Sequence, residues 1–217
     1  RWHGDPTPGP RPIRLKGVNI DLGFIVSNDA LHYREPVPRF VMVPLGKETD
    51  WDSVALLQAN AFYNSDKETY IWYTSWDTGG GAVPAVQDPL GPHNRPFAIG
   101  LLTMPRDRFG YLARLPGKIQ YNQTTVVSRE IRLRHSAKLF VNVDGVSPSD
   151  ALKIELVDQF EQPLSGFTAQ VTTNALKGQV QWAGGKDLPS DRSFRIKVSW
   201  ARSGPSNPRL YALYVER

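Results

Sequence analysis

The sequence of 217 residues contains no cysteine, which excludes a disulfide framework, a thiolate nucleophile and a cysteine-ligated metal site. It has only four histidines, and no two of them have the spacing of metal ligands on a helix or a strand. The Gly79–Gly81 run lacks the Gly-Lys-Ser/Thr ending of a phosphate-binding loop. We therefore expect neither a metal ion nor another cofactor.

Long apolar runs and helical patterning are also missing. No stretch approaches about 18 consecutive apolar residues, so the sequence predicts no membrane-spanning helix and no membrane partner. No window of about 11 residues repeats its apolar positions with the helical period. Apolar and polar residues instead alternate over short runs rich in β-branched and aromatic residues. The predicted strands are 21–27, 40–43, 53–58, 69–76, 97–104, 124–128, 138–143, 151–157, 167–172, 179–182, 193–200 and 209–214.

Seven of these strands fall in the last half of the chain, a density typical of a β-sandwich. In 193–200, apolar side chains at even positions alternate with Arg195 and Lys197, so one face should meet a core and the other water. Trp182 and Trp200 occupy such inward positions. We interpret them as core residues, with a role as sugar-stacking platforms as the alternative.

The net charge of +5 and the isoelectric point near 9.5 raise the question of nucleic-acid binding. The basic residues are scattered singly, and only Arg129, Arg132 and Arg134 cluster. This distribution is typical of a solvated face, with a polyanion site as the alternative. We therefore expect no nucleic-acid partner.

Composition shifts along the chain. Residues 1–110 carry 11 Lys and Arg against 12 Asp and Glu, whereas residues 111–217 carry 15 against 9. The first part also holds 12 of the 18 prolines, several of them in residues 1–17, which should form an extended strap. These shifts predict two domains, 1–110 and 111–217.

Hydrolysis of a glycosidic bond normally needs two carboxylates, one as acid and one as base or nucleophile. Glu35, which precedes Pro36, is the candidate catalytic carboxylate, and an ion pair with an arginine is its alternative role. Asp50 and Asp52 flank Trp51, a composition found in sugar sites, although an exposed loop has the same pattern. We expect Asp29 to accept hydrogen bonds from the backbone of its own turn.

Three segments stand in a distinctive order before the predicted sandwich. Residues 21–36 read DLGFIVSNDALHYREP, residues 58–73 read QANAFYNSDKETYIWY, and residues 99–110 read IGLLTMPRDRFG. The sandwich follows, with KLFVNV at 138–143 and LYA at 210–212. In this order the chain resembles the end of the five-bladed β-propeller glycoside hydrolase-like proteins, which are related to levanases, invertases and arabinanases.

The resemblance extends over residues 20–217 and implies an all-β fold, with a partial β-propeller of one or two blades followed by an antiparallel β-sandwich. Five blades need on the order of 300 residues. It therefore implies that the early blades, which carry essential carboxylates in this family, lie outside this sequence. The chain would be the C-terminal portion of a glycoside hydrolase-like protein and catalytically incomplete by itself. The family has glycine where this chain has Ala30 and Ala59, so positive φ angles are expected there.

The expected partner is an oligosaccharide or polysaccharide, and we expect an extracellular or periplasmic location. The alternative functions are a non-catalytic carbohydrate-binding module and an assembly module whose open sheet edges pair with a second copy of the chain. For carbohydrate binding, the predicted contact residues are Asp50, Trp51, Asp52, Trp72 and Trp76.

Overall fold

The computed structural model describes residues 2–3, 19–47, 50–53, 55–75, 98–114, 124–200 and 206–217. Within these ranges every regular element is a strand and no residue is helical. The strands form several antiparallel sheets, none of which closes into a barrel, so the all-β class is confirmed. The same ranges contain no helix that is long and apolar enough to cross a membrane.

The chain divides into two compact units, Arg1–Met104 and Pro105–Arg217. The change in composition that the sequence shows after Gly110 therefore lies a few residues inside the second unit. The strands of the first unit are β1 (Trp2–His3), β2 (Asn19–Ile20), β3 (Leu22–Gly23), β4 (Val26–Ser27), β5 (Tyr33–Arg34), β6 (Val41–Val43), β7 (Leu56–Asn64), β8 (Glu68–Ser75) and β9 (Ile99–Pro105), the last of which ends at the unit boundary.

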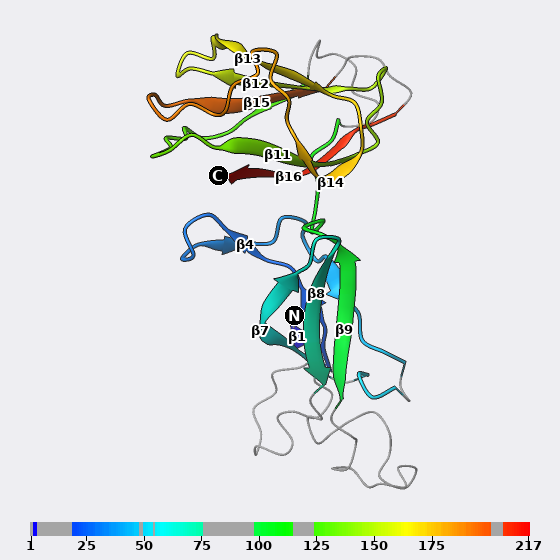
Figure 1. Cartoon of the computed structure of the whole chain (residues 1–217). Helices are drawn as coiled ribbons and strands as arrows, with labels where there is room; N and C mark the ends of the chain where they lie inside the picture. Colours follow the sequence, from blue (N-terminus) through cyan, green and yellow to red (C-terminus); the bar gives the residue numbers. More distant parts are fainter. Residues whose placement is uncertain are drawn as a thin grey trace, which may run out of the picture. The chain divides into compact units, whose positions relative to one another are not determined.

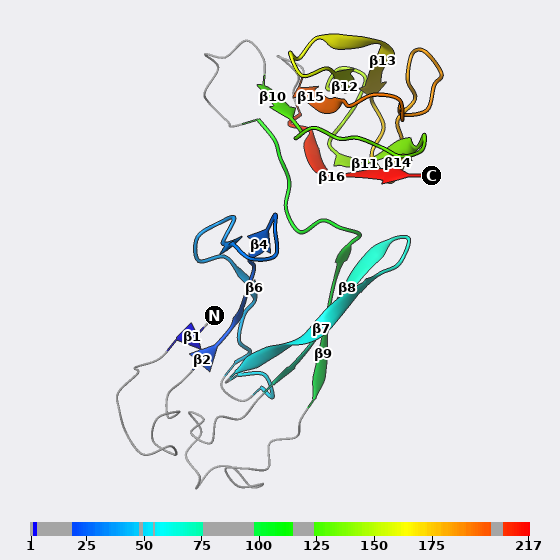
Figure 2. The same cartoon turned by 90° about the vertical axis from the view of Figure 1, so that its left-hand side faces the viewer.

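The largest sheet among the described residues of the first unit is the meander β7–β8–β9 (Figure 1). The shorter strands pair as β1–β2, β3–β6 and β4–β5. Figure 2 shows the three strands of the meander side by side. Along β7 and β8 the register pairs Tyr63 with Tyr70 and Phe62 with Ile71. Because side chains alternate between faces along a strand, these two cross-strand pairs lie on opposite faces of the sheet.

The position of Gly100 shows which residues of β9 lie on each face of the sheet. A Cβ atom at this position would overlap the ring of Tyr73, so Gly100 and Tyr73 share one face of the sheet. Ile99 and Leu101 therefore lie on the other face, with Trp72. On that face Ile99 is 76% exposed, Leu101 49% and Trp72 38%.

The first unit has a thin core. Among its described residues, only Val43, Ala55 and Leu56 are buried apolar side chains. Most of the large apolar side chains that are exposed in the described chain also belong to this unit.

The second unit consists of two facing sheets, with strand orders β10–β15–β12–β13 and β14–β11–β16 (Figures 1 and 2). Its strands are β10 (Thr124–Val127), β11 (Lys138–Asp144), β12 (Leu152–Val157), β13 (Pro163–Val171), β14 (Ala175–Gln179), β15 (Arg195–Trp200) and β16 (Arg209–Glu216). One apolar cluster fills the space between the sheets, including Leu139 and Val141 of β11 with Leu152 and Ile154 of β12. The alternating pattern of β12 and β15 predicted this burial correctly.

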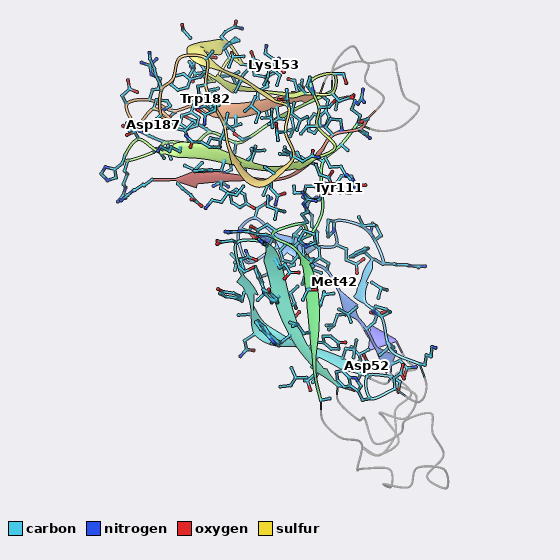
Figure 3. The ribbon with its side chains drawn as sticks, turned by 45° about the vertical axis from the view of Figure 1, so that its right-hand side comes forward. Met42, Asp52, Tyr111, Lys153, Trp182 and Asp187 are labelled. Atoms are coloured by element: carbon cyan, nitrogen blue, oxygen red, sulfur yellow. The ribbon has the colours of Figure 1, made fainter. Side chains whose placement is uncertain are left out.

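Both tryptophans of the second unit are core residues, as predicted. Trp182 is 7% exposed and meets Phe167 edge to face, with 5.7 Å between ring centroids. Figure 3 shows Trp182 between the two sheets. Trp200 is 3% exposed, and its indole N–H donates to the carbonyl oxygen of Pro208 at 2.7 Å. Neither ring is available as a sugar-stacking platform.

Two local expectations are wrong. The strand predicted at 179–182 is instead Ala175–Gln179, because the apolar alternation of Val180 and Trp182 reflects burial of a segment that follows the strand. Ala59, expected at a positive φ, lies inside β7 and is absent from the residues with positive φ. Ala30 does have a positive φ of 61°, as expected.

Replacing Ala30 with glycine should leave the free energy of unfolding unchanged or raise it by up to about 1 kcal/mol, because a Cβ in the left-handed region is strained. The matched change Ala59→Gly places glycine in a strand and should lower stability by about 0.5–1 kcal/mol. Urea denaturation of both variants measures the change in the free energy of unfolding. Equal losses in the two would contradict the strain at Ala30.

Candidate functional site

Asp50, Trp51 and Asp52 form a short turn against Gly46. The Gly46 N–H donates to the carbonyl oxygen of Asp52 at 3.2 Å, and the Lys47 N–H donates to Oδ2 of Asp50 at 2.8 Å. A Cβ atom at Gly46 would overlap Oδ1 of Asp52 and lie 3.1 Å from Oδ2 of Asp50. The two carboxylates thus flank Gly46, and only glycine leaves room for them there.

Tyr73 joins this turn to the sheet. Its ring stacks on Trp51 with 5.7 Å between centroids and 16° between planes, and its hydroxyl donates to Oδ2 of Asp52 at 3.3 Å. Burial, followed by the negative charge of Asp52, raises the pKa of the Tyr73 hydroxyl, which therefore stays protonated as a donor. Figure 3 shows Asp52 at the end of the sheet where β9 begins. Sequence reasoning found the two aspartates and Trp51 but missed Tyr73, whose place depends on pairing between distant segments.

Trp72 lies on the opposite face of β8 from Tyr73 and takes no part in the aspartate turn. It belongs to a row of three stacked aromatic rings. Tyr63 and Tyr70 are 6.1 Å apart between centroids, and Tyr70 and Trp72 are 6.3 Å apart. Tyr63 is 59% exposed and Trp72 is 38% exposed, so the row faces solvent. We call Tyr63, Tyr70 and Trp72 the aromatic row.

A carboxylate stands beside the aromatic row. The Tyr70 hydroxyl donates to Oε2 of Glu68 at 2.8 Å, and this hydrogen bond raises the pKa of Tyr70. The row therefore combines apolar ring surface with a hydroxyl and a carboxylate. This is the combination by which aromatic sites orient a ligand that is apolar on one side and polar at its edges.

Glu35 is an exposed residue engaged in its own turn. Its Oε2 accepts the backbone N–H of Arg39 at 2.8 Å, and Arg39 has a positive φ of 62°. The described residues provide no ion pair between Glu35 and an arginine. The proposed catalytic role of Glu35 stays a prediction. Trp76 lies outside the described residues.

Asp29 holds together the turn between β4 and β5, as expected. Its Oδ1 accepts the backbone N–H groups of Leu31 at 2.9 Å and His32 at 2.8 Å, as well as the Ser27 hydroxyl at 2.9 Å. Its Oδ2 lies 2.6 Å from Nδ1 of His32, a pair that the sequence analysis missed. The His32 side chain, followed by the backbone donors, holds the pKa of Asp29 well below its ordinary value of 3.8.

The Arg106–Phe109 segment fastens the start of the second unit to the sheet β14–β11–β16. Arg108 donates from Nε to Oδ1 of the fully buried Asn142 at 3.2 Å and pairs with Asp144 at 3.1 Å. Its guanidinium also lies 4.5 Å from the centroid of the Tyr211 ring. The Tyr214 hydroxyl donates to Asp107 at 2.7 Å. Because these charges are already engaged, we assign this network a structural role.

The described residues therefore separate the predicted site into parts. Asp50, Trp51 and Asp52 come together with Tyr73, Trp72 joins the aromatic row, and Glu35 stands in a turn of its own. Within the same residues, no group of three or more histidines and carboxylates could hold a metal ion. Comparisons with protein-family models, with curated proteins and with solved structures found no match to this chain.

The lowered pKa of Asp29 makes the stability of its turn depend on pH. Its ionised form stabilises the turn, so this stabilisation should be complete above an ordinary aspartate pKa and should fade only as the pH falls through the lower folded-state pKa. Carboxyl-carbon NMR titration should show Asp29 titrating below the other aspartates. The variant His32→Ala should raise its midpoint, because the strongest donor is lost. An unchanged midpoint in that variant would contradict the assignment.

Proposed function

We propose that the chain binds carbohydrate as a non-catalytic part of a glycoside hydrolase-like protein. The observation that carries the proposal is the aromatic row, three stacked rings on one face of β7 and β8, of which Tyr63 and Trp72 are exposed. Exposed apolar surface of this kind marks binding sites in soluble proteins. A sugar ring suits it, since its C–H groups can lie on an aromatic face while its hydroxyls reach polar neighbours such as Glu68.

The small number of buried apolar side chains among the described residues of the first unit supports its assignment as part of a larger glycoside hydrolase-like protein. A unit with few buried apolar residues and many exposed ones gains stability by packing against further β-sheet. Blades of a β-propeller pack face to face in this way. We infer that the first unit corresponds to one or two such blades, in agreement with the resemblance of residues 20–110 to that family.

Hydrolysis by this chain alone is not part of the proposal. A glycosidase needs two carboxylates facing one glycosidic bond. Glu35 and Asp50 each use a carboxylate oxygen to accept a backbone N–H of their own turns, and Asp52 accepts from Tyr73. These three carboxylates are better placed to order the chain than to exchange protons with a substrate. An extracellular or periplasmic location, where polysaccharides are met, agrees with a binding role.

The variant Trp72→Ala should weaken binding of polysaccharides such as fructan or arabinan about tenfold, or about 1.4 kcal/mol, because it removes one end of the aromatic row. Phe62→Ala is the matched control, since Phe62 is an aromatic residue of similar exposure, 54%, on the other face of the same sheet. Isothermal titration calorimetry and affinity electrophoresis measure the difference. Equal losses in both variants, or no binding by the unaltered chain, would contradict the proposal.

A second candidate function is self-association through the face of the β7–β8–β9 sheet that carries the aromatic row. The exposed Ile99 and Leu101 of β9 favour it, because apolar side chains at 76% and 49% exposure are stabilised by contact with protein. The double variant Ile99→Asp and Leu101→Asp should convert a dimer to a monomer in analytical ultracentrifugation. A monomeric unaltered chain over the micromolar range would exclude this candidate and leave carbohydrate binding as the role of the face.

A further inference from the structure

The sandwich carries a cavity that neither the sequence analysis nor the proposed function uses. It has a volume of about 180 Å³. Its lining is mostly polar and consists of Glu130, Asp158, Gln159, Ser193, Phe194 and Arg195. The volume is below the roughly 300–1,000 Å³ of sites for drug-sized ligands, so the cavity suits one small unit.

Backbone hydrogen bonds fix one wall of the cavity. The Ile131 N–H donates to the carbonyl oxygen of Phe194 at 2.8 Å, and the Phe194 N–H donates back to Ile131 at 3.0 Å. This bridge sets Glu130 on one segment beside Ser193 and Arg195 on the other. Phe194 itself is 1% exposed, so it forms the floor of the cavity and is anchored in the core.

The turn between β12 and β13 forms the other wall. Oδ1 of Asp158 accepts the backbone N–H of Phe160 at 2.8 Å and that of Gln162 at 2.9 Å, which holds the turn closed. The Gln159 side chain and the second carboxylate oxygen of Asp158 are left for other contacts. Phe160 stands on the same turn and is 72% exposed, an unusual placement for a large apolar side chain.

The polar groups of the cavity are not satisfied by one another. Nε of Arg195 is buried and has no hydrogen-bond partner among the described residues. Arg195 makes no ion pair with Glu130 or Asp158, although all three line the same cavity. Buried donors in folded proteins nearly always have a partner, so the unpaired Nε–H of Arg195 leaves an unmet hydrogen bond in the wall of this cavity.

The charges of the lining narrow the class of ligand. An anion would be attracted by Arg195 but repelled by Glu130 and Asp158, and a metal ion would be repelled by Arg195. A neutral polyol has neither problem, because each hydroxyl both donates to a carboxylate and accepts from a guanidinium. Gln159 and Ser193 add an amide and a hydroxyl of the same mixed character.

We propose that this cavity binds a single sugar unit through adjacent hydroxyls, which accept from Arg195 and donate to Glu130 and Asp158. The proposal adds a second sugar site, on the second unit, to the carbohydrate binding proposed for the aromatic row. The two sites share no residue, so either can fail without the other.

The test is an NMR titration of the intact chain with glucose, galactose, fructose and arabinose, each to about 100-fold excess over the protein. At least one sugar should shift the amide signals of 158–162 and 193–195. The variant Arg195→Met should weaken binding of that sugar about tenfold or more. The variant Glu130→Gln, at an exposed position, should weaken its binding several-fold. The control Arg134→Gln removes an exposed arginine outside the cavity and should leave affinity unchanged.

The outcomes separate this site from the aromatic row. Trp72→Ala should leave the cavity shifts intact, and Arg195→Met should leave binding at the aromatic row intact. Circular dichroism shows whether Arg195→Met folds, and if it does not, Glu130→Gln carries the test. The proposal is overturned by the absence of shifts at these amides with every sugar. It is also overturned by tighter binding of inorganic phosphate or free glycine, which would mark an anion or zwitterion site.

Discussion

Side chains of β8 leave the strand on alternate sides, and this alternation determines what the first unit can do. Tyr73 faces the side on which Asp52 and Trp51 lie, and its ring covers Gly100. Trp72, one residue earlier, faces the other side, where Tyr63 and Tyr70 extend its aromatic surface. The sheet thus keeps the cluster of Asp52, Trp51 and Tyr73 on one face and the exposed aromatic row on the other.

The two units differ in how their apolar residues are used. In the second unit, alternating strands from two sheets enclose one core that includes Trp182 and Trp200. The first unit presents a comparable pattern of alternation in β8 and β9, but one side of it meets solvent. The same period of two therefore yields a closed core in one case and, among the described residues of the first unit, a solvent-exposed face in the other.

Much of the fold could be predicted from local pattern. The strands of the sandwich, the burial of Trp182 and Trp200, and the hydrogen-bonding role of Asp29 all depend on neighbours close in sequence. The site depends on contacts between distant segments, and there the sequence falls short. Asp50 and Asp52 were recognisable, but their partner Tyr73 is 21 residues further along the chain from Asp52.

The cavity of the sandwich was likewise invisible in the sequence, since Glu130, Asp158 and Arg195 come from three separate segments. Alternating burial of side chains can also occur outside a hydrogen-bonded strand, and this explains why the strand was predicted at 179–182. Val180 and Trp182 are buried at alternate positions, as strand residues often are, although they lie after β14 ends at Gln179.

The attachment of Arg106 and Arg108 to the sandwich bears on how the two units come apart. A protease must draw several residues of extended backbone into its cleft, and chain that is tied by side-chain hydrogen bonds resists this. Arg108 contacts both Asn142 and Asp144, and Asn142 in turn donates to the carbonyl oxygen of Arg106 at 2.6 Å. The backbone that directly follows β9 is thereby shielded from cleavage. High salt screens the Arg108–Asp144 pair and should weaken the attachment of this segment to the sandwich.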